Sequence, residues 1–276
     1  NMMNKAINTL VLATVDSLKK FKIKLTSYLA VFAMIFFGST TVSNAATVAV
    51  DSDGTIGGAS ATSEIDADGN GDDAITLKAV ETLVIQRETS VATIVTLTAG
   101  TTSLDLDSAT AHSLIVTGSI TAADATDLTI VVDAAHGLTV GGAITEFDRG
   151  TDNQIVVTLE AGSDLTLNGS TAAVIHGLIS GDSAGNGIVA FAGTGLKTID
   201  DVLGTTGIAT ISSAASSNGL IKKATRATNV TIAGTLSFED ILIGNDGSAA
   251  AVTAMTGTTS TLNLNGITSK IITSSV

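Results

Sequence analysis

Apolar and polar residues alternate along residues 155–172 in two short runs, V-T-L-E and L-T-L-N, and a glycine follows each run. Successive side chains of a β-strand point to opposite faces, so one face of each run is apolar. The residues expected to point inward are Val157, Leu159, Leu165 and Leu167. Neither run is long enough to bury its apolar face alone, which indicates that like runs stack on each other.

The same pattern recurs along the chain. Residues 95–106 have the form of residues 157–167, with two alternating runs on either side of a glycine. A strand–glycine–strand phrase also recurs around Gly118, Gly142, Gly169, Gly234 and Gly266. The intervals between these glycines are 24, 27, 65 and 32 residues, and the longest fits two to three coils. Such periods are typical of stacked strand units. The pattern therefore predicts an all-β chain, a parallel β-helix (β-solenoid) of short glycine-punctuated strands.

A β-sandwich is the alternative, because it also contains short strands separated by turns. Two features favour the solenoid. The phrase itself repeats with its glycine at a constant offset, and aromatic residues to fill a wide core are scarce after residue 45: only Phe147, Phe191 and Phe238 occur there. Proline is absent, so every backbone N–H can join a strand ladder.

Residues 180–229 interrupt the regular phrasing and predict an irregular insertion. Leu196, Ile199 and Val202 have helical spacing, and Gly204 is placed as a helix stop. This spacing predicts a short helix projecting from the solenoid. Regular phrasing resumes at Asn229.

Residues 1–45 have the order of a secretory signal peptide with an extended n-region. Five lysines precede an apolar core at Leu29–Phe37, and small residues follow up to Ala46. We expect a helical signal segment, cleaved after Ala45 or Ala46, and a solenoid over residues 46–276. A membrane anchor is the alternative, but Leu25–Phe37 gives 13 residues, whereas a spanning helix needs about 20. The start ahead of two methionines and the abrupt end predict the N-terminal part of a longer protein.

The net charge of the predicted exported part restricts the classes of partner that it can bind. Removing residues 1–45 takes away five lysines and Asp16, which leaves 8 basic and 25 acidic groups and a formal charge of −17. So acidic a surface argues against nucleic acid and anionic lipid as partners, and we expect no integral membrane domain in this segment. The chain has no cysteine, so its stability must come from repetition rather than from disulfides.

The most acidic segment is the candidate ion site. Its oxygen donors recur at nearly every second position among glycines, which is what calcium requires of a loop. These donors are Asp66, Asp68, Asn70, Asp72 and Asp73. The twelfth position is Leu77 where an EF-hand has glutamate, so the alternative is a solvated acidic turn. No other cofactor is expected.

Other polar residues give no catalytic motif. Asp105 and Asp107 lie on one face of a predicted strand, where they serve either acid–base chemistry or solubility, and solubility is favoured. We expect His112, His136 and His176 to be exposed single residues. The only basic cluster after residue 45, Lys222, Lys223 and Arg226, is expected in a solvated loop. We therefore predict no enzymatic activity.

The phrases L-x-V-x-G, L-x-L-N-G and V-T-L-x-A-G across residues 91–176 and 230–268 resemble those of bacterial autotransporter passengers and β-helical surface adhesins. The resemblance implies an exported cell-surface solenoid that contacts a host or neighbouring cell, its glycans or a second copy of itself. Two other functions stay open: a surface-layer lattice protein that binds calcium, and a secreted β-helical polysaccharide lyase or hydrolase using Asp105 and Asp107.

Overall fold

The computed structural model describes eleven ranges of the chain. They are residues 47–50, 54–56, 71–77, 82–96, 100–122, 126–146, 155–240, 242–244, 250–256, 259–264 and 272–274. Residues 45–276 form one compact unit; residues 1–44, which hold the predicted signal peptide, lie outside the described ranges. A search of the described ranges for a helix long and apolar enough to cross a membrane finds none.

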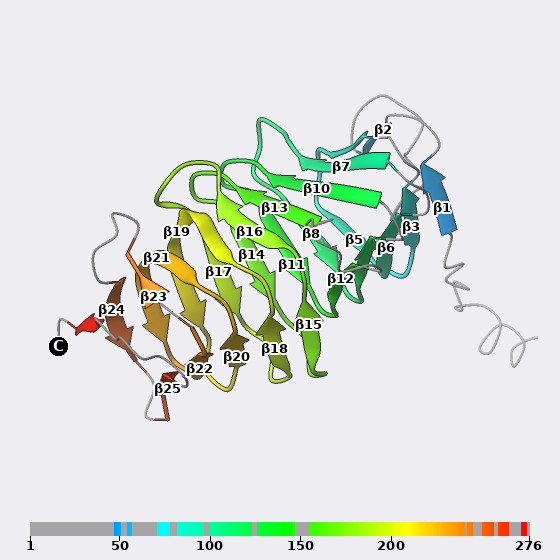
Figure 1. Ribbon diagram of the computed structural model, residues 1–276. Coiled ribbons are helices and arrows are strands. Elements are labelled where there is room, and N and C mark those ends of the chain that lie inside the picture. The colour runs from blue at the N-terminus through cyan, green and yellow to red at the C-terminus, as the bar shows by residue number, and fades with distance from the viewer. Residues whose placement is uncertain are drawn as a thin grey trace, which may run out of the picture. The chain divides into compact units, whose positions relative to one another are not determined.

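Every element of regular structure in the described ranges is a β-strand, and neighbouring strands pair in parallel (Figure 1). Each coil adds one strand to each of three faces in turn, which confirms the predicted β-solenoid. The first face is a ten-stranded sheet. In order its strands are β1 (Thr47–Val50), β3 (Ala74–Leu77), β6 (Thr93–Thr96), β9 (Ile120–Ala122), β12 (Ile144–Glu146), β15 (Ala173–Ile175), β18 (Leu196–Ile199), β20 (Asn218–Ile221), β22 (Thr235–Phe238) and β25 (Thr261–Leu264).

The second and third faces share a sixteen-stranded sheet. The second face contains β2 (Gly54–Ile56), β4 (Thr82–Ile85), β7 (Gly100–Leu106), β10 (Thr126–Val132), β13 (Ile155–Leu159) and β16 (Leu178–Gly181). The third contains β5 (Thr89–Val91), β8 (Ser113–Val116), β11 (Gly137–Val140), β14 (Asp164–Leu167) and β17 (Asn186–Phe191). The long strands β19 (Leu203–Ser213) and β21 (Thr225–Ile232) run through both faces. Beyond them lie β23 (Leu242–Ile243), β24 (Ala250–Met255) and β26 (Ile272–Ser274).

A ladder of isoleucines forms the first-face side of the core. Seven consecutive strands of that face place an isoleucine at the same register position, and each of these side chains is 0% exposed. They are Ile75, Ile94, Ile120, Ile144, Ile175, Ile199 and Ile221. Branching at Cβ suits such stacking on a pleated surface. The core is therefore narrow, which explains why the chain needs few aromatic residues.

The predicted register of residues 157–167 is confirmed. The four residues expected inside are at most 1% exposed. Val157 pairs with Ile130 and Ile179 on the second face, and Leu167 pairs with Val140 and Phe191 on the third. The two runs thus lie on different faces of one coil, each between two like neighbours.

The glycine phrases around Gly118, Gly142, Gly169 and Gly234 mark the corner between the third face and the first. Gly142 donates a 2.7 Å backbone hydrogen bond to the carbonyl oxygen of Gly118 on the preceding coil. A Cβ at Gly142 would lie 2.7 Å from the Gly118 carbonyl carbon, so a side chain does not fit there. The 65-residue interval contains three coils, because the Leu165 position is repeated at Val189, Ile211 and Val230.

Two of the predicted alignments between repeats were wrong, because they placed a segment on the wrong face or exchanged its inward and outward positions. In residues 95–106, Thr96 is fully buried and Val95 half-buried, and Leu104 lies on the second face, whereas Leu165 lies on the third. Leu262 pairs with Leu236 on the first face rather than with Val230 on the third. All three faces use the same alternation, so similar phrases can fall on different faces. A shift of one residue also exchanges the inward and outward positions.

The predicted insertion over residues 180–229 was also wrong. Strands β17 to β21 continue the coils there, with one register shift between β19 and β21 in the segment from Leu203 to Ile208. The segment expected to be helical contains strand β18, in which Lys197 is buried while Leu196 is 37% exposed. Gly204, the expected helix stop, has a φ of +79° inside β19, where a Cβ would lie 2.4 Å from the carbonyl oxygen of Arg226. The glycine is required by close backbone approach between coils.

Candidate functional site

The acidic segment predicted to bind calcium is only partly described. Asp66, Asp68 and Asn70 lie outside the described residues. Asp73 is 4% exposed, and its carbonyl oxygen accepts a 2.6 Å hydrogen bond from the Ala92 N–H, which places the end of the segment beside the next coil. Within the described ranges no three or more His, Cys, Asp or Glu side chains are grouped as metal ligands. Calcium binding by these five residues stays a prediction.

A row of carboxylates follows the second face. Each is the first residue after a second-face strand, and its N–H donates a hydrogen bond of 3.0–3.3 Å to the last residue of the strand one coil earlier. The four residues, here called the acidic ladder, are Asp107, Asp133, Glu160 and Asp182. Asp105 lies beside this ladder on the outward side of β7, and Leu104 and Leu106 are fully buried on the other side, as predicted.

Burial and the crowding of like charges raise the pKa values of two carboxyl groups in and beside the acidic ladder. Burial raises the pKa of Asp133 to about 6, with further increases from the charges of Glu160, Asp105 and Asp107 and from a side-chain hydrogen bond with Asp107. The pKa of Asp105 is also raised, first by burial and then by Asp107 and Glu160. The Asp133 carboxyl is therefore partly protonated near pH 6.

The ladder carboxylates also bind neighbouring turns. Glu160 Oε2 accepts a 3.2 Å hydrogen bond from the Ala134 N–H, and Asp182 Oδ1 accepts one of 2.7 Å from Asn186 Nδ2. Sequence reasoning singled out only Asp107 among the four. The other three could have been identified by their shared position, because each is an acidic residue directly after the last inward residue of a second-face strand.

The expectation that all three histidines are exposed was wrong. His112 is 9% and His136 3% exposed, and they occupy equivalent positions on adjacent coils. Their ring centroids are 4.3 Å apart at an interplanar angle of 79°. The 24 residues between them equal one coil, as between Thr121 and Thr145, so stacking brings the two rings into contact.

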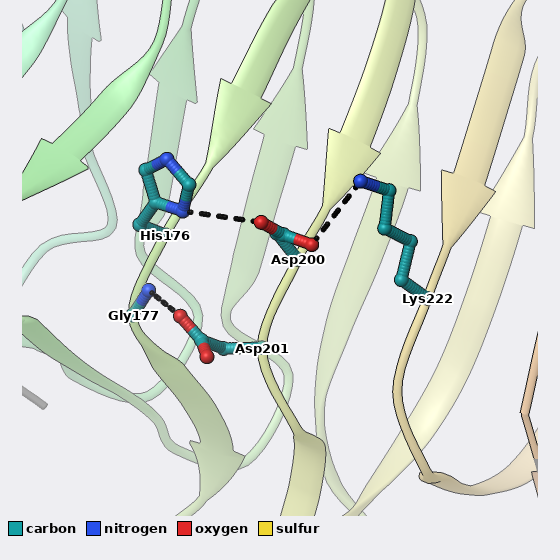
Figure 2. A network of polar contacts seen from close by, with 5 residues as sticks. All are labelled: His176, Gly177, Asp200, Asp201 and Lys222. Atoms are coloured by element: carbon teal, nitrogen blue, oxygen red, sulfur yellow. Dashed lines mark hydrogen bonds and ion pairs between the residues drawn. The ribbon is translucent and has the colours of Figure 1, made fainter. Parts of the chain in front are cut away.

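His176 belongs instead to a charged row at the corner between the first and second faces (Figure 2). His176, Asp200 and Lys222 occupy successive coils at one position. Asp200 lies 3.7 Å from His176 Nδ1 and 3.3 Å from Lys222 Nζ, and Asp201 accepts a 2.9 Å hydrogen bond from the Gly177 N–H. The expectation that the basic cluster lies in a solvated loop was therefore wrong in part. Lys222 is paired and Arg226 belongs to β21, whereas Lys223 is exposed.

Lys197 is a charged group inside the solenoid that sequence reasoning missed. Its side chain is 0% exposed, and Nζ donates hydrogen bonds of 2.6 Å to the Gly141 carbonyl oxygen and 3.1 Å to the Thr171 carbonyl oxygen. Desolvation lowers its pKa. Its strand neighbours at this position are the small residues Ala173 and Gly219.

Comparisons with known proteins add no family to this description. No protein-family model matches the chain, and no match was found among curated proteins or among solved structures. The function is therefore inferred from the fold and from the positions of its polar residues.

Proposed function

We propose that the chain is an exported, non-enzymatic β-solenoid that displays a repeating polar surface at the cell surface for adhesion or structural contact. The observation that carries this proposal is the alignment of equivalent residues from coil to coil, seen in the isoleucine ladder and in the acidic ladder. Each added coil extends the same rows of outward side chains. A surface of this kind suits a partner that repeats as well, such as a glycan, a cell surface or a second copy of the chain.

Within that surface, the acidic ladder is the proposed contact. It gathers four carboxylates at one corner over four successive coils, and most of the chain's outward positions nearby are uncharged. Closely spaced carboxylates attract cationic groups and divalent cations. The partner is therefore expected to present positive charges or to be bridged through calcium.

A binding experiment tests this contact. The labelled full-length chain is titrated onto cells and a glycan array, and its self-association is measured by sedimentation. We expect saturable binding to at least one of these, weakened about tenfold or more when Asp107→Asn, Asp133→Asn and Glu160→Gln are combined. The matched control combines Thr139→Ala and Thr166→Ala on the third face. Absence of saturable binding to every partner would overturn the proposal, and equal binding by the triple variant would exclude the ladder as the contact.

Export requires its own experiment, because it rests on residues 1–45 alone. The full-length chain carrying a C-terminal tag is expressed in a bacterium, and the tagged product is located and weighed by mass spectrometry. We expect a product outside the cytoplasm that begins at Ala46 or Thr47. A cytoplasmic product that keeps residues 1–45 would contradict export by a cleaved signal.

Cleavage of an acidic polysaccharide is the second candidate function, and one observation favours it. Asp133 titrates near pH 6 beside Asp107, so a proton donor and a carboxylate base lie on adjacent coils. Release of sugars from polygalacturonate or alginate by the full-length chain, and its loss in Asp107→Asn, would establish this function in place of display.

A further inference from the structure

The buried histidine pair has the proton arrangement of metal ligands. His136 Nδ1 lies 2.8 Å from the carbonyl oxygen of Ala134, and His112 Nδ1 lies 3.2 Å from that of Thr110. A carbonyl oxygen only accepts hydrogen bonds, so the contact of His136 favours the tautomer with the proton on Nδ1 and a lone pair on Nε2. His112 Nδ1 also lies 3.3 Å from Ser108 Oγ, but that hydroxyl donates to the Thr110 carbonyl oxygen, so the same tautomer fits His112. In protein metal sites a ligating histidine commonly donates its other N–H to a backbone carbonyl in this way.

The two Nε2 atoms are buried and unused. Neither His112 Nε2 nor His136 Nε2 has a hydrogen-bond partner in the described part of the chain. A buried acceptor without a partner costs free energy, so a ligand that uses its lone pair would be favoured.

The solenoid holds the two rings together. The Gly137 N–H donates a 3.1 Å hydrogen bond to the His112 carbonyl oxygen, which fixes the two turns one coil apart, and the ring centroids are 4.3 Å apart. A zinc–nitrogen bond is about 2.0–2.1 Å long, so an ion held by both imidazoles would lie between the two coils. The His136 N–H donates a 3.0 Å hydrogen bond to the Asp133 carbonyl oxygen, and the His136 carbonyl oxygen accepts one of 3.0 Å from the Asp164 N–H, so the backbone on both sides of His136 is held in place.

We propose that His112 and His136 form a binding site for a divalent transition-metal ion that prefers imidazole, with zinc as the probe. The two Nε2 atoms supply two ligands, and the turns beside the rings, at residues 109–111 and 134–135, are exposed. The bound ion joins two successive coils. The site is separate from the acidic ladder's proposed role as a contact surface, and it does not involve the predicted calcium segment.

Zinc titration of the full-length chain followed by imidazole ¹⁵N NMR tests the site on the unaltered protein. The chain has three histidines, so their signals can be resolved and assigned. We expect the Nε2 signals of His112 and His136 to shift together with zinc and the His176 signals to stay in place. No zinc-dependent shift, or a shift of His176 alone, would overturn the proposal.

Histidine variants provide a second test of the zinc site. Zinc affinity is measured by competition with a fluorescent chelator for His136→Gln and for the matched control His176→Gln, after circular dichroism has confirmed their β-structure. We expect His136→Gln to weaken zinc binding about tenfold or more and His176→Gln to leave it unchanged. Equal affinity in the two variants would refute the site. If His136→Gln does not fold, the spectrum of the unaltered chain decides.

Discussion

Lys197 Nζ donates a 2.6 Å hydrogen bond to the carbonyl oxygen of Gly141, which lies two coils earlier. A second bond reaches Thr171 on the coil between them. One side chain thus links three coils at the corner between the third and first faces, with its charge enclosed by the fold.

Replacing this lysine tests whether the link stabilises the solenoid. Lys197→Met keeps the apolar stem but leaves the Gly141 and Thr171 carbonyls without these donors, so we expect a loss of about 1–3 kcal/mol in the free energy of unfolding. Urea unfolding measures it. The control Lys223→Met removes an exposed lysine and should change stability by less than about 0.5 kcal/mol. A more stable Lys197→Met variant would mean that desolvation of the ammonium outweighs its two hydrogen bonds.

The raised pKa of Asp133 predicts how the stability of the folded chain changes with pH. Its pKa is raised to about 6 in the folded state from 3.8, so the folded state binds the proton more tightly than the unfolded state does. Stability from this group is therefore greatest below about pH 4, falls as the pH rises to about 6 and is constant above that. Because the side chain is only partly buried and solvent screens its charge, we expect Asp133→Asn to stabilise the chain by only about 1 kcal/mol at pH 7.

Thermal unfolding from pH 4 to pH 8 measures this effect. Asp127→Asn, at the opposite end of β10 and exposed, is the control and should keep the pH dependence of the unaltered chain. If Asp133→Asn and the unaltered chain lose stability equally over this range, the carboxyl is not the titrating group.

The inward register at Leu167 can be tested with a charge. Leu167→Asp places a carboxylate between Val140 and Phe191 with no partner, and we expect it to cost at least about 3 kcal/mol. Thr139→Asp places the same charge on the outward side of the same face, one coil earlier, and should be close to neutral. Melting temperatures compare the two, and similar values would refute the assigned register.

The turns between the second and third faces contain a left-handed residue. Ala135 has a φ of +64°, and Gly162, at the same place in the next coil, has a φ of +74°. Gly162→Ala should cost about 1 kcal/mol, because space is open there and only the backbone conformation opposes a side chain. Ala135→Gly should be neutral or stabilise by up to about 1 kcal/mol. Chemical unfolding of both variants checks the contrast, and a destabilised Ala135→Gly would oppose it.

Calcium removal tests the acidic segment. If Asp66, Asp68, Asn70, Asp72 and Asp73 bind calcium, melting in calcium should occur above the temperature observed with a chelator, because ligand binding stabilises the folded state. Asp68→Asn should abolish the difference. An identical melting temperature in calcium and in chelator would leave the solvated turn as the explanation.

The β-solenoid and its alternation could be predicted because both depend on local periodicity, as at Val157 and Leu167. The face on which each strand lies could not be predicted, because the sequence patterns of the three faces are alike and the length of a coil varies. Hydrogen-bonded partners one coil apart are separated by 21 residues at one place and by 26 at another. The burial of Lys197 could not be predicted either, because the two carbonyl oxygens that accept its hydrogen bonds, those of Gly141 and Thr171, lie 56 and 26 residues away in sequence. Contact between His112 and His136 became visible only once the coil length there was known.

The parallel pairing of the strands has a mechanical consequence. Hydrogen bonds between coils run across the strands, so tension that separates one coil from the next acts along those bonds. The isoleucine ladder and the two cross-coil bonds of Lys197 resist the same separation. A solenoid anchored at one end and pulled at the other would therefore carry load through every coil junction in series, and the junction with the fewest bonds would set its breaking force.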